Sequence, residues 1–336
     1  MALVVRSASH SQLQRIIILA VTNFLVVAFA EAWWGYLNYL LIGENRPRLL
    51  HIEDGAGILV ENILLKQSPY WTFYAHDVNG IEVRHSAVEV HYDNATDHDW
   101  LDISAFNTDG FDIAGSNVYV HDVTVWNDDD CVCVKGMDGS GKRTQCSENW
   151  LVERVTASGV GLTIGSIGPS VHHTCVNNIT FRDAYMYNTF KGIYMKSRPG
   201  SGSNAETASI TNILYENITI HNATQWSLWI GPQQASYGGA CSLFWPFLPS
   251  ADCPAPPQVT WENITLRDIH IQGGLISPGV ILGNASNPMR SIVFDNVVAS
   301  EPGSNPFGAA GYSCAGVANA VATGGTSPAP PCFEVN

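Results

Sequence analysis

Two short segments place aspartates at matching positions in the chain. Asp109 lies in the segment Asn-Thr-Asp-Gly-Phe-Asp-Ile at 107–113, and Asp130 follows in Asn-Asp-Asp-Asp-Cys-Val-Cys-Val at 127–134. Each aspartate precedes the last apolar residue of a short strand-like run by four positions. If the chain advances by one coil between them, the two carboxylates stack on neighbouring strands about 5 Å apart. Asp129 flanks the same spot, so three carboxyl groups converge there, as acid/base cleavage of a glycosidic bond requires.

Two kinds of short strand recur along the chain in a fixed order. The first kind ends at Ile113, Val134, Ile164, Met195, Ile230 and Leu282, in steps of 21, 30, 31, 35 and 52 residues. The second kind is a polar pair between two apolar residues, at 60–63, 120–123, 152–155, 215–218, 261–264 and 294–297. A loose period of about 20 to 50 residues is typical of a solenoid. A β-sandwich also has alternating strands, but it does not repeat two strand types in order. We therefore predict an all-β, single-stranded parallel β-helix.

Composition agrees with one elongated domain, which we expect to span residues 33–336. The chain has 336 residues, of which 46% are apolar and only 14% charged, so it can bury a large core. Its formal net charge of −14 disfavours nucleic acid as a partner, because phosphate binding needs a basic face. The glycines are scattered and form no phosphate-binding loop at a helix start. We expect no cofactor and no bound metal.

The N-terminal segment 1–32 resembles a targeting sequence. Its apolar run at 16–30 follows Arg6 and Arg15 and is followed by small residues. The run is short for a membrane span, so it favours a signal peptide, with a signal anchor as the competing interpretation. After cleavage of such a leader we expect no stable membrane association.

Sequons and cysteines also indicate a secreted, extracellular protein. Six N-glycosylation sequons occur, at Asn94, Asn178, Asn217, Asn222, Asn263 and Asn284. Several of them lie on the repeated strand pattern, where asparagine can instead serve a turn or an asparagine ladder. The spacing of Cys241 with Cys253, and of Cys314 with Cys332, suits local disulfides. Two further pairings, Cys146 with Cys175 and Cys131 with Cys133, stay open.

The motifs that carry these aspartates resemble those of glycoside hydrolase family 28, the pectin-cutting polygalacturonases and rhamnogalacturonan hydrolases. The resemblance rests on 107–109, 129–131 and Ser-Gly-Val-Gly-Leu-Thr-Ile-Gly-Ser at 158–166, and it runs from about Trp33 to the C-terminus. It implies a right-handed parallel β-helix, hydrolysis with inversion, and an N-terminal cap that is shortened in this chain. It also implies that Asp129 is the general acid and that Asp109 and Asp130 activate the attacking water. For Asp112 and Asp128 we favour a plain turn role, in which the carboxylate caps backbone amides.

Two departures from the polygalacturonase pattern bear on specificity. Val160 stands where polygalacturonases carry the histidine of Gly-His-Gly, and Tyr194 stands where they carry the arginine of Arg-Ile-Lys. An isopropyl group cannot hydrogen-bond, and a neutral ring cannot hold a uronate carboxylate as a guanidinium does. Lys196 keeps the motif's cation, and Arg198 lies just beyond it. We therefore expect Val160, Tyr194, Lys196 and Arg198 to contact substrate.

The resemblance is stronger to the exo-acting rhamnogalacturonase or α-L-rhamnosidase-like branch of the family. These residues favour a secreted, monomeric hydrolase of pectic polysaccharide or oligosaccharide. We expect it to cleave rhamnogalacturonan from the chain end. An exo-polygalacturonase acting on homogalacturonan is the nearest alternative. A calcium-dependent β-helical lyase and a non-catalytic cell-wall-binding β-helix are alternatives of other classes.

Overall fold

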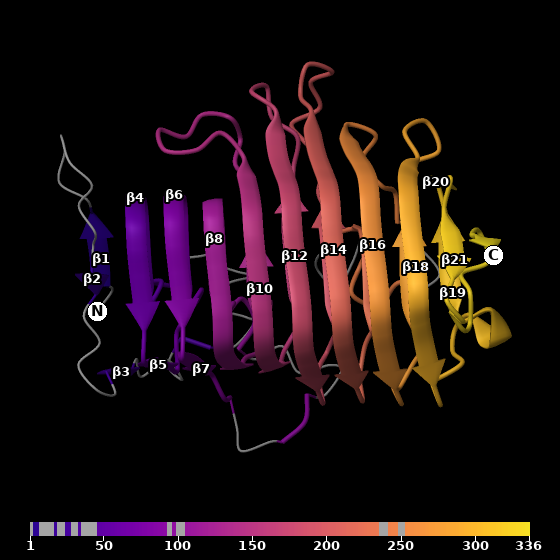
Figure 1. Ribbon diagram of the computed structural model, residues 1–336, viewed down its shortest axis with the longest axis horizontal. Helices are drawn as coiled ribbons and strands as arrows, with labels where there is room; N and C mark the ends of the chain where they lie inside the picture. Colours follow the sequence, from indigo (N-terminus) through magenta and orange to yellow (C-terminus); the bar gives the residue numbers. More distant parts are fainter. Residues whose placement is uncertain are drawn as a thin grey trace.

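Long parallel strands lie side by side and give the protein its elongated shape (Figure 1). The computed structural model describes residues 3–6, 17–18, 24–27, 33–34, 46–92, 96–98, 105–234, 241–247 and 253–336. The long strands are β4 (Leu50–Glu61), β6 (Phe73–Arg84), β8 (Phe111–Trp126), β10 (Ser147–Ser158), β12 (Thr174–Tyr187), β14 (Ala208–His221), β16 (Val259–Gln272) and β18 (Met289–Ser300). Each pairs in parallel with the next long strand in sequence. The predicted parallel β-helix is confirmed.

Short strands complete each coil. One series stacks next to the site: β9 (Val132–Val134), β11 (Leu162–Ile167), β13 (Ile193–Ser197), β15 (Leu228–Pro232), β17 (Gly279–Leu282) and β19 (Tyr312–Ala315). The start of β8 pairs with β9 in the register Phe111↔Val132 and Ile113↔Val134. The remaining strands are β1 (Leu3–Arg6), β2 (Ile17–Ile18), β3 (Phe24–Val27), β5 (Ile63–Lys66), β7 (Ala87–Glu89), β20 (Val317–Ala318), β21 (Val321–Thr323) and β22 (Glu334–Val335). The described residues contain one 3₁₀ turn, η2 (Gly308–Ala310), and no α-helix.

Corners with positive φ bend each long strand around the core. In β14, Asn212 and Asn217 have φ of 57° and 51°, and they lie where two successive side chains point away from the core. Asparagine tolerates this left-handed conformation better than most residues. The corner side chains stack from coil to coil, as Asn178 donates to Asn149 (2.9 Å) and Asn117 donates to Asn79 (2.9 Å). Asn178, Asn217 and Asn263 therefore serve corners and ladders, whether or not their sequons carry glycans.

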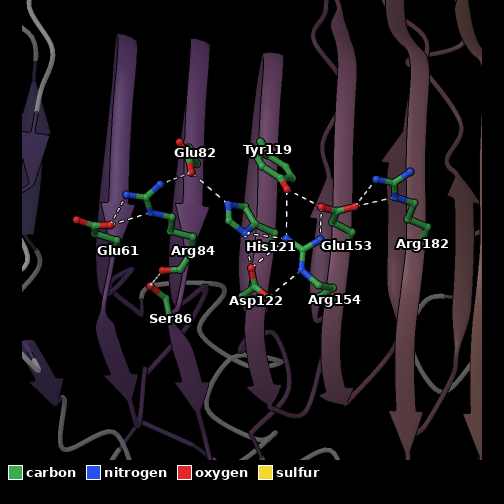
Figure 2. A network of polar contacts seen from close by, with 10 residues as sticks. All are labelled: Glu61, Glu82, Arg84, Ser86, Tyr119, His121, Asp122, Glu153, Arg154 and Arg182. Atoms are coloured by element: carbon green, nitrogen blue, oxygen red, sulfur yellow. Dashed lines mark hydrogen bonds and ion pairs between the residues drawn. The ribbon is translucent and has the colours of Figure 1, made fainter.

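A column of charged and polar side chains runs across the outer face of the long sheet, and Figure 2 shows its part from Glu61 to Arg182. Strand register stacks one side chain per coil at this position: Glu61, Arg84, His121, Glu153, Arg182, Glu216, Arg267 and Asp295. Some neighbours in the column form ion pairs, such as Arg84 with Glu61 (2.7 Å) and Arg182 with Glu153 (2.6 Å), and Glu82 links Arg84 to His121. An isolated surface pair adds little stability, but a network of this length helps to fix the register between coils.

The structure has three disulfides among the described residues, and they decide the two cysteine pairings left open. Cys241–Cys253 and Cys314–Cys332 form as predicted, and Cys146 also pairs with Cys175. Cys131 and Cys133 are free and buried, so the fourth candidate pairing does not form. Their sulfur atoms contact different groups, the Asn127 side chain and the Gly165 carbonyl, respectively.

The predicted leader, residues 1–32, lies mostly outside the described residues. Its described segments β1 and β2 pair with β4, and β3 pairs with β5. The leader and the domain boundary at 33 stay predictions. In the part of the chain that the structure describes, no helix is long and apolar enough to cross a bilayer. The sequon at Asn94 also falls outside the described residues.

Candidate functional site

Two bends at the strand entries position the three aspartates. Asp109 directly precedes the bend that starts β8, and Asp129 and Asp130 lie in the bend before β9. The Gly110 N–H donates to the Asp130 carbonyl (2.8 Å), which holds the two bends one coil apart. Each of the three carboxyl groups has an oxygen within 4.8 Å of an oxygen of the others, and all three are buried. Adjacent residues on a regular strand would face opposite sides, so the bend is what allows Asp129 and Asp130 to share one site.

Two lysines lie between these carboxylates. Lys196 Nζ is 2.7 Å from Asp130 Oδ2 and 3.0 Å from Asp130 Oδ1. Lys135 Nζ is 3.1 Å from Asp109 Oδ2, 3.1 Å from Asp112 Oδ2 and 3.8 Å from Asp130 Oδ2. The Thr163 hydroxyl also donates to Asp130 Oδ1 (2.9 Å). These contacts make Asp130 the most strongly stabilised carboxylate of the group.

The turn role expected for Asp112 is wrong, and Asp128 pairs with a histidine. Asp112 is the second residue of β8, so its side chain faces outward between two core residues and meets Lys135 at the floor of the site. The Asp128 carboxylate pairs with His98 Nδ1 at 3.2 Å, and the His98 ring stacks on Phe190. Neither Asp112 oxygen accepts a hydrogen bond from a backbone amide of the described residues.

Burial and charge give the aspartates different proton affinities. Burial, reinforced by the Asp109 and Asp130 carboxyls, raises the pKa of Asp129 to about 8. Burial and the charge of Asp112 also raise the pKa of Asp109 well above its ordinary value. Burial would raise the pKa of Asp130 too, but Lys196 and Lys135 outweigh it, so this pKa is lowered. At mildly acidic pH the cluster therefore holds a protonated Asp129 next to an ionised Asp130.

A cleft of ≈ 510 Å³ opens over this cluster. Trp71 lies one coil before Asp109, since the Thr72 N–H donates to the Asp109 carbonyl (2.7 Å), and its ring is 5.1 Å from that of Tyr74. The Arg48 guanidinium packs on both rings, at 4.6 Å from Trp71 and 4.4 Å from Tyr74. The cleft lining is Trp71, Tyr74, His76, Phe106, Asn107, Asp109, Asp129, Asp130, Lys135, Gly136, Ser166, Lys196, Arg198, Gln233 and Gln234. Flat aromatic faces beside acids suit a sugar ring.

The four residues expected to contact substrate occupy different places. Arg198 is exposed and lines the cleft. Lys196 also lines it, but its ammonium group is paired with Asp130. Tyr194 is buried, with its hydroxyl accepting the Gln234 N–H (3.0 Å) and its ring 4.4 Å from Lys196 Nζ. Val160 is buried in the wall of a smaller pocket beside Asp129.

Sequence reasoning missed Lys135 and Trp71. Both could be found from the strand pattern. Lys135 directly follows the buried strand β9, and Trp71 lies as far before β6 as Asp109 lies before β8. The Asp109, Asp129 and Asp130 oxygens are close enough to hold a cation. Lys135 and Lys196 already supply two positive charges to that group, so the donor set does not call for a metal ion.

Comparison with known proteins gives one family. A family model described as "Glycosyl hydrolases family 28" matches residues 30–317. The chain is 32% identical over 188 residues to a probable rhamnogalacturonase E of Aspergillus flavus, covering 56% of this chain and 35% of that protein. It is 28% identical over 238 residues to an endopolygalacturonase of Emericella nidulans, covering 70% of this chain and 54% of that protein. The alignments thus span a third to a half of these relatives.

A solved structure shares the fold. Endopolygalacturonase I of Stereum purpureum, complexed with two galacturonates, is 17% identical, with a TM-score of 0.57 over 90% of this chain and 78% of that one. The expected right-handed parallel β-helix is confirmed by this likeness.

Proposed function

Because this chain belongs to glycosyl hydrolases family 28, we propose that it hydrolyses a glycosidic bond in the backbone of pectin. The observation that carries the proposal is the buried group of three carboxyls whose members differ in proton affinity. One protonated and one ionised carboxyl beside a sugar-sized cleft is what general acid/base hydrolysis needs. We propose rhamnogalacturonan, attacked from a chain end, as the substrate, with the relatives' names and the Val160 and Tyr194 replacements in support.

In this mechanism Asp129 donates its proton to the leaving oxygen. Asp130, with Asp109 beside it, takes a proton from the attacking water. Asp109 Oδ1 is buried and has no hydrogen-bond partner among the described residues, so it has an acceptor available for that water. Lys196 keeps Asp130 ionised. Asp109 lies close enough to Asp129 for the two carboxyl groups to titrate together.

The short separation of the carboxyls bears on the stereochemistry. Inverting glycosidases usually hold their two carboxyls about 6.5–9.5 Å apart to leave room for water, and retaining ones about 5–5.5 Å apart. Here the nearest oxygens are within 4.8 Å, but both Asp130 oxygens are held by Lys196. A carboxylate fixed in this way is poorly placed to attack carbon, so we propose inversion. Proton NMR of the first-formed anomer tests this, and a retained anomer would refute it.

Product profiling on rhamnogalacturonan and homogalacturonan tests the proposed activity. We expect release of small products from rhamnogalacturonan with little early loss of viscosity, since end attack leaves chains long. The Asp129→Asn variant should lose this activity, and Asp183→Asn, at an exposed corner of β12, should keep it. Rapid midchain cutting of homogalacturonan would favour an endo-polygalacturonase instead. An unsaturated product that absorbs ultraviolet light would indicate a lyase.

A further inference from the structure

A small pocket of ≈ 50 Å³ adjoins the cleft beside Asp129. It shares Phe106, Asp129, Lys196 and Gln234 with the cleft lining, so a sugar near the scissile bond can reach it. Its apolar wall comes from Val160, Phe190, Tyr194 and Leu243. Val160, Phe190 and Tyr194 also pack in one buried aromatic and aliphatic cluster, which makes the wall rigid. By the same measure a single water needs about 10–15 Å³, so the pocket has room for a methyl-sized group.

The pocket also contains one buried acceptor that lacks a partner. Gln234 Nε2 donates to the Ser242 carbonyl (3.3 Å), which fixes the orientation of the side-chain amide. Gln234 Oε1 is buried and has no hydrogen-bond partner among the described residues. A buried acceptor without a donor costs free energy, so it marks a place where a ligand hydroxyl group can donate.

Above about pH 7, the charges of the pocket disfavour a uronate carboxylate. The Lys196 ammonium group is already paired with Asp130, and the Lys191 amine hydrogen-bonds to Gln225. Burial, with the nearby charge of Lys196, lowers the pKa of Lys191 to about 7, so this amine is neutral above that pH and charged below it. Asp128 and Asp129 line the same pocket and would repel an anion when ionised.

We propose that this pocket receives the C6 methyl group of a 6-deoxyhexose next to the scissile bond, while the neighbouring C4 hydroxyl donates to Gln234 Oε1. The inference rests on the proposed function, because that function brings a pectic sugar chain into the adjoining cleft. Val160 is the residue that makes the wall apolar at this point, where an imidazole would present a polar atom. A 6-hydroxyl or 6-carboxyl group would place a polar atom against this apolar wall.

Saturation-transfer NMR tests where the methyl group binds without relying on turnover. The probe is a rhamnogalacturonan oligosaccharide, and the protein carries Asp109→Asn, which blocks hydrolysis and lies outside the pocket lining. We expect the C6 methyl protons to receive the strongest saturation. Adding Val160→Leu, which fills the pocket, should remove that preference, whereas Val160→Thr should weaken it and keep the shape. Equal saturation of the ring and methyl protons, or no change with Val160→Leu, would overturn the proposal.

Kinetics on the active enzyme provides the second test. Val160→Thr should lower kcat/KM on rhamnogalacturonan oligomers by about 10-fold, within the range that a methyl-sized group contributes in an apolar pocket, and lower it less on oligogalacturonates. An equal loss on both substrates would overturn the methyl site while leaving the hydrolase function in place. Conversely, methyl saturation in a protein that hydrolyses no pectic polymer would refute the proposed function and leave the binding site standing.

Discussion

Asp129→Asn isolates the proton on which the proposed mechanism depends. Burial and neighbouring carboxyls raise the pKa of Asp129 to about 8, so the parent enzyme carries that proton throughout the acidic and neutral range. Asparagine has the same shape but no transferable proton. General acid catalysis contributes about 10²–10⁴-fold, so kcat should fall by that factor, or about 2.7–5.4 kcal/mol in activation free energy.

The substitution also has a stability cost that the contacts define. Asp129 Oδ1 accepts the Asp130 N–H (2.8 Å) and Oδ2 accepts the Asn107 N–H (3.0 Å). An asparagine amide has only one oxygen, so one of these donors meets an NH₂ group instead. A buried donor left unpaired costs about 1–3 kcal/mol, which chemical denaturation measures. The variant should still fold, because the core strands on either side are unchanged.

The assay compares a natural oligosaccharide with a substrate that has an activated aryl leaving group. Asp129→Asn should recover much of its lost rate on the aryl substrate, because that group departs without protonation. Asp130→Asn should show no such recovery, since it serves the water. The alkaline limb of the parent's pH–rate profile, near pH 8, should disappear in Asp129→Asn. Near-full activity of a folded Asp129→Asn protein on the natural substrate would refute the assignment of the acid.

Three further predictions follow from the charges of the site. Lys135→Met should shift the acid limb of kcat/KM to higher pH, because Lys135 helps to hold the pKa of Asp130 down, whereas Lys142→Met, at an exposed lysine, should not. Thermal stability should fall from pH 5 to pH 8. Folding raises the pKa from 3.8 to about 8 for Asp129 and to about 6 for Asp112, so the folded state holds more protons than the unfolded state in that range. A Tm from scanning fluorimetry that stays level or rises over this range contradicts the prediction. Treatment with EDTA should leave hydrolysis unchanged, because lysines neutralise the carboxylates, and a loss restored by calcium would favour the lyase alternative.

The stacking of Asp109 and Asp130 could be predicted because both lie at one offset from the end of a short strand. The distance from the strand fixes a residue's position on its coil. Parallel register then stacks residues that have the same position on successive coils. The need for a bend at Asp129 followed from strand alternation alone. The disulfides that close local loops were predictable from spacing, whereas Cys146–Cys175 depends on the bridge between Met137 and Cys175, which joins different coils.

The parts that could not be predicted depend on distances between side chains. Lys196 and Arg198 are two residues apart, and both were expected to contact substrate. The structure pairs Lys196 with Asp130 and leaves Arg198 exposed at the cleft. Which cation meets a carboxylate depends on strand direction and burial, and a one-dimensional pattern carries neither. Tyr194, also expected at the substrate, packs against Lys196, accepts the Gln234 N–H and lines the small pocket beside Asp129.

Asp112 shows how the register makes the site more than three aspartates. Asp112 stacks on Cys133 of the next coil, and Cys133 stacks on Thr163 of the coil after that. All three lie on the outward face of the strands that carry the cluster. Lys135, one residue beyond the end of β9, bridges it to Asp109 and Asp130. A one-residue slip between β8 and β9 would turn Asp112 into the core and separate these charges. Asparagine ladders and ion pairs of the long sheet hold β8 in register with β6 and β10, so side chains far from the cleft help to fix the strand that carries Asp112.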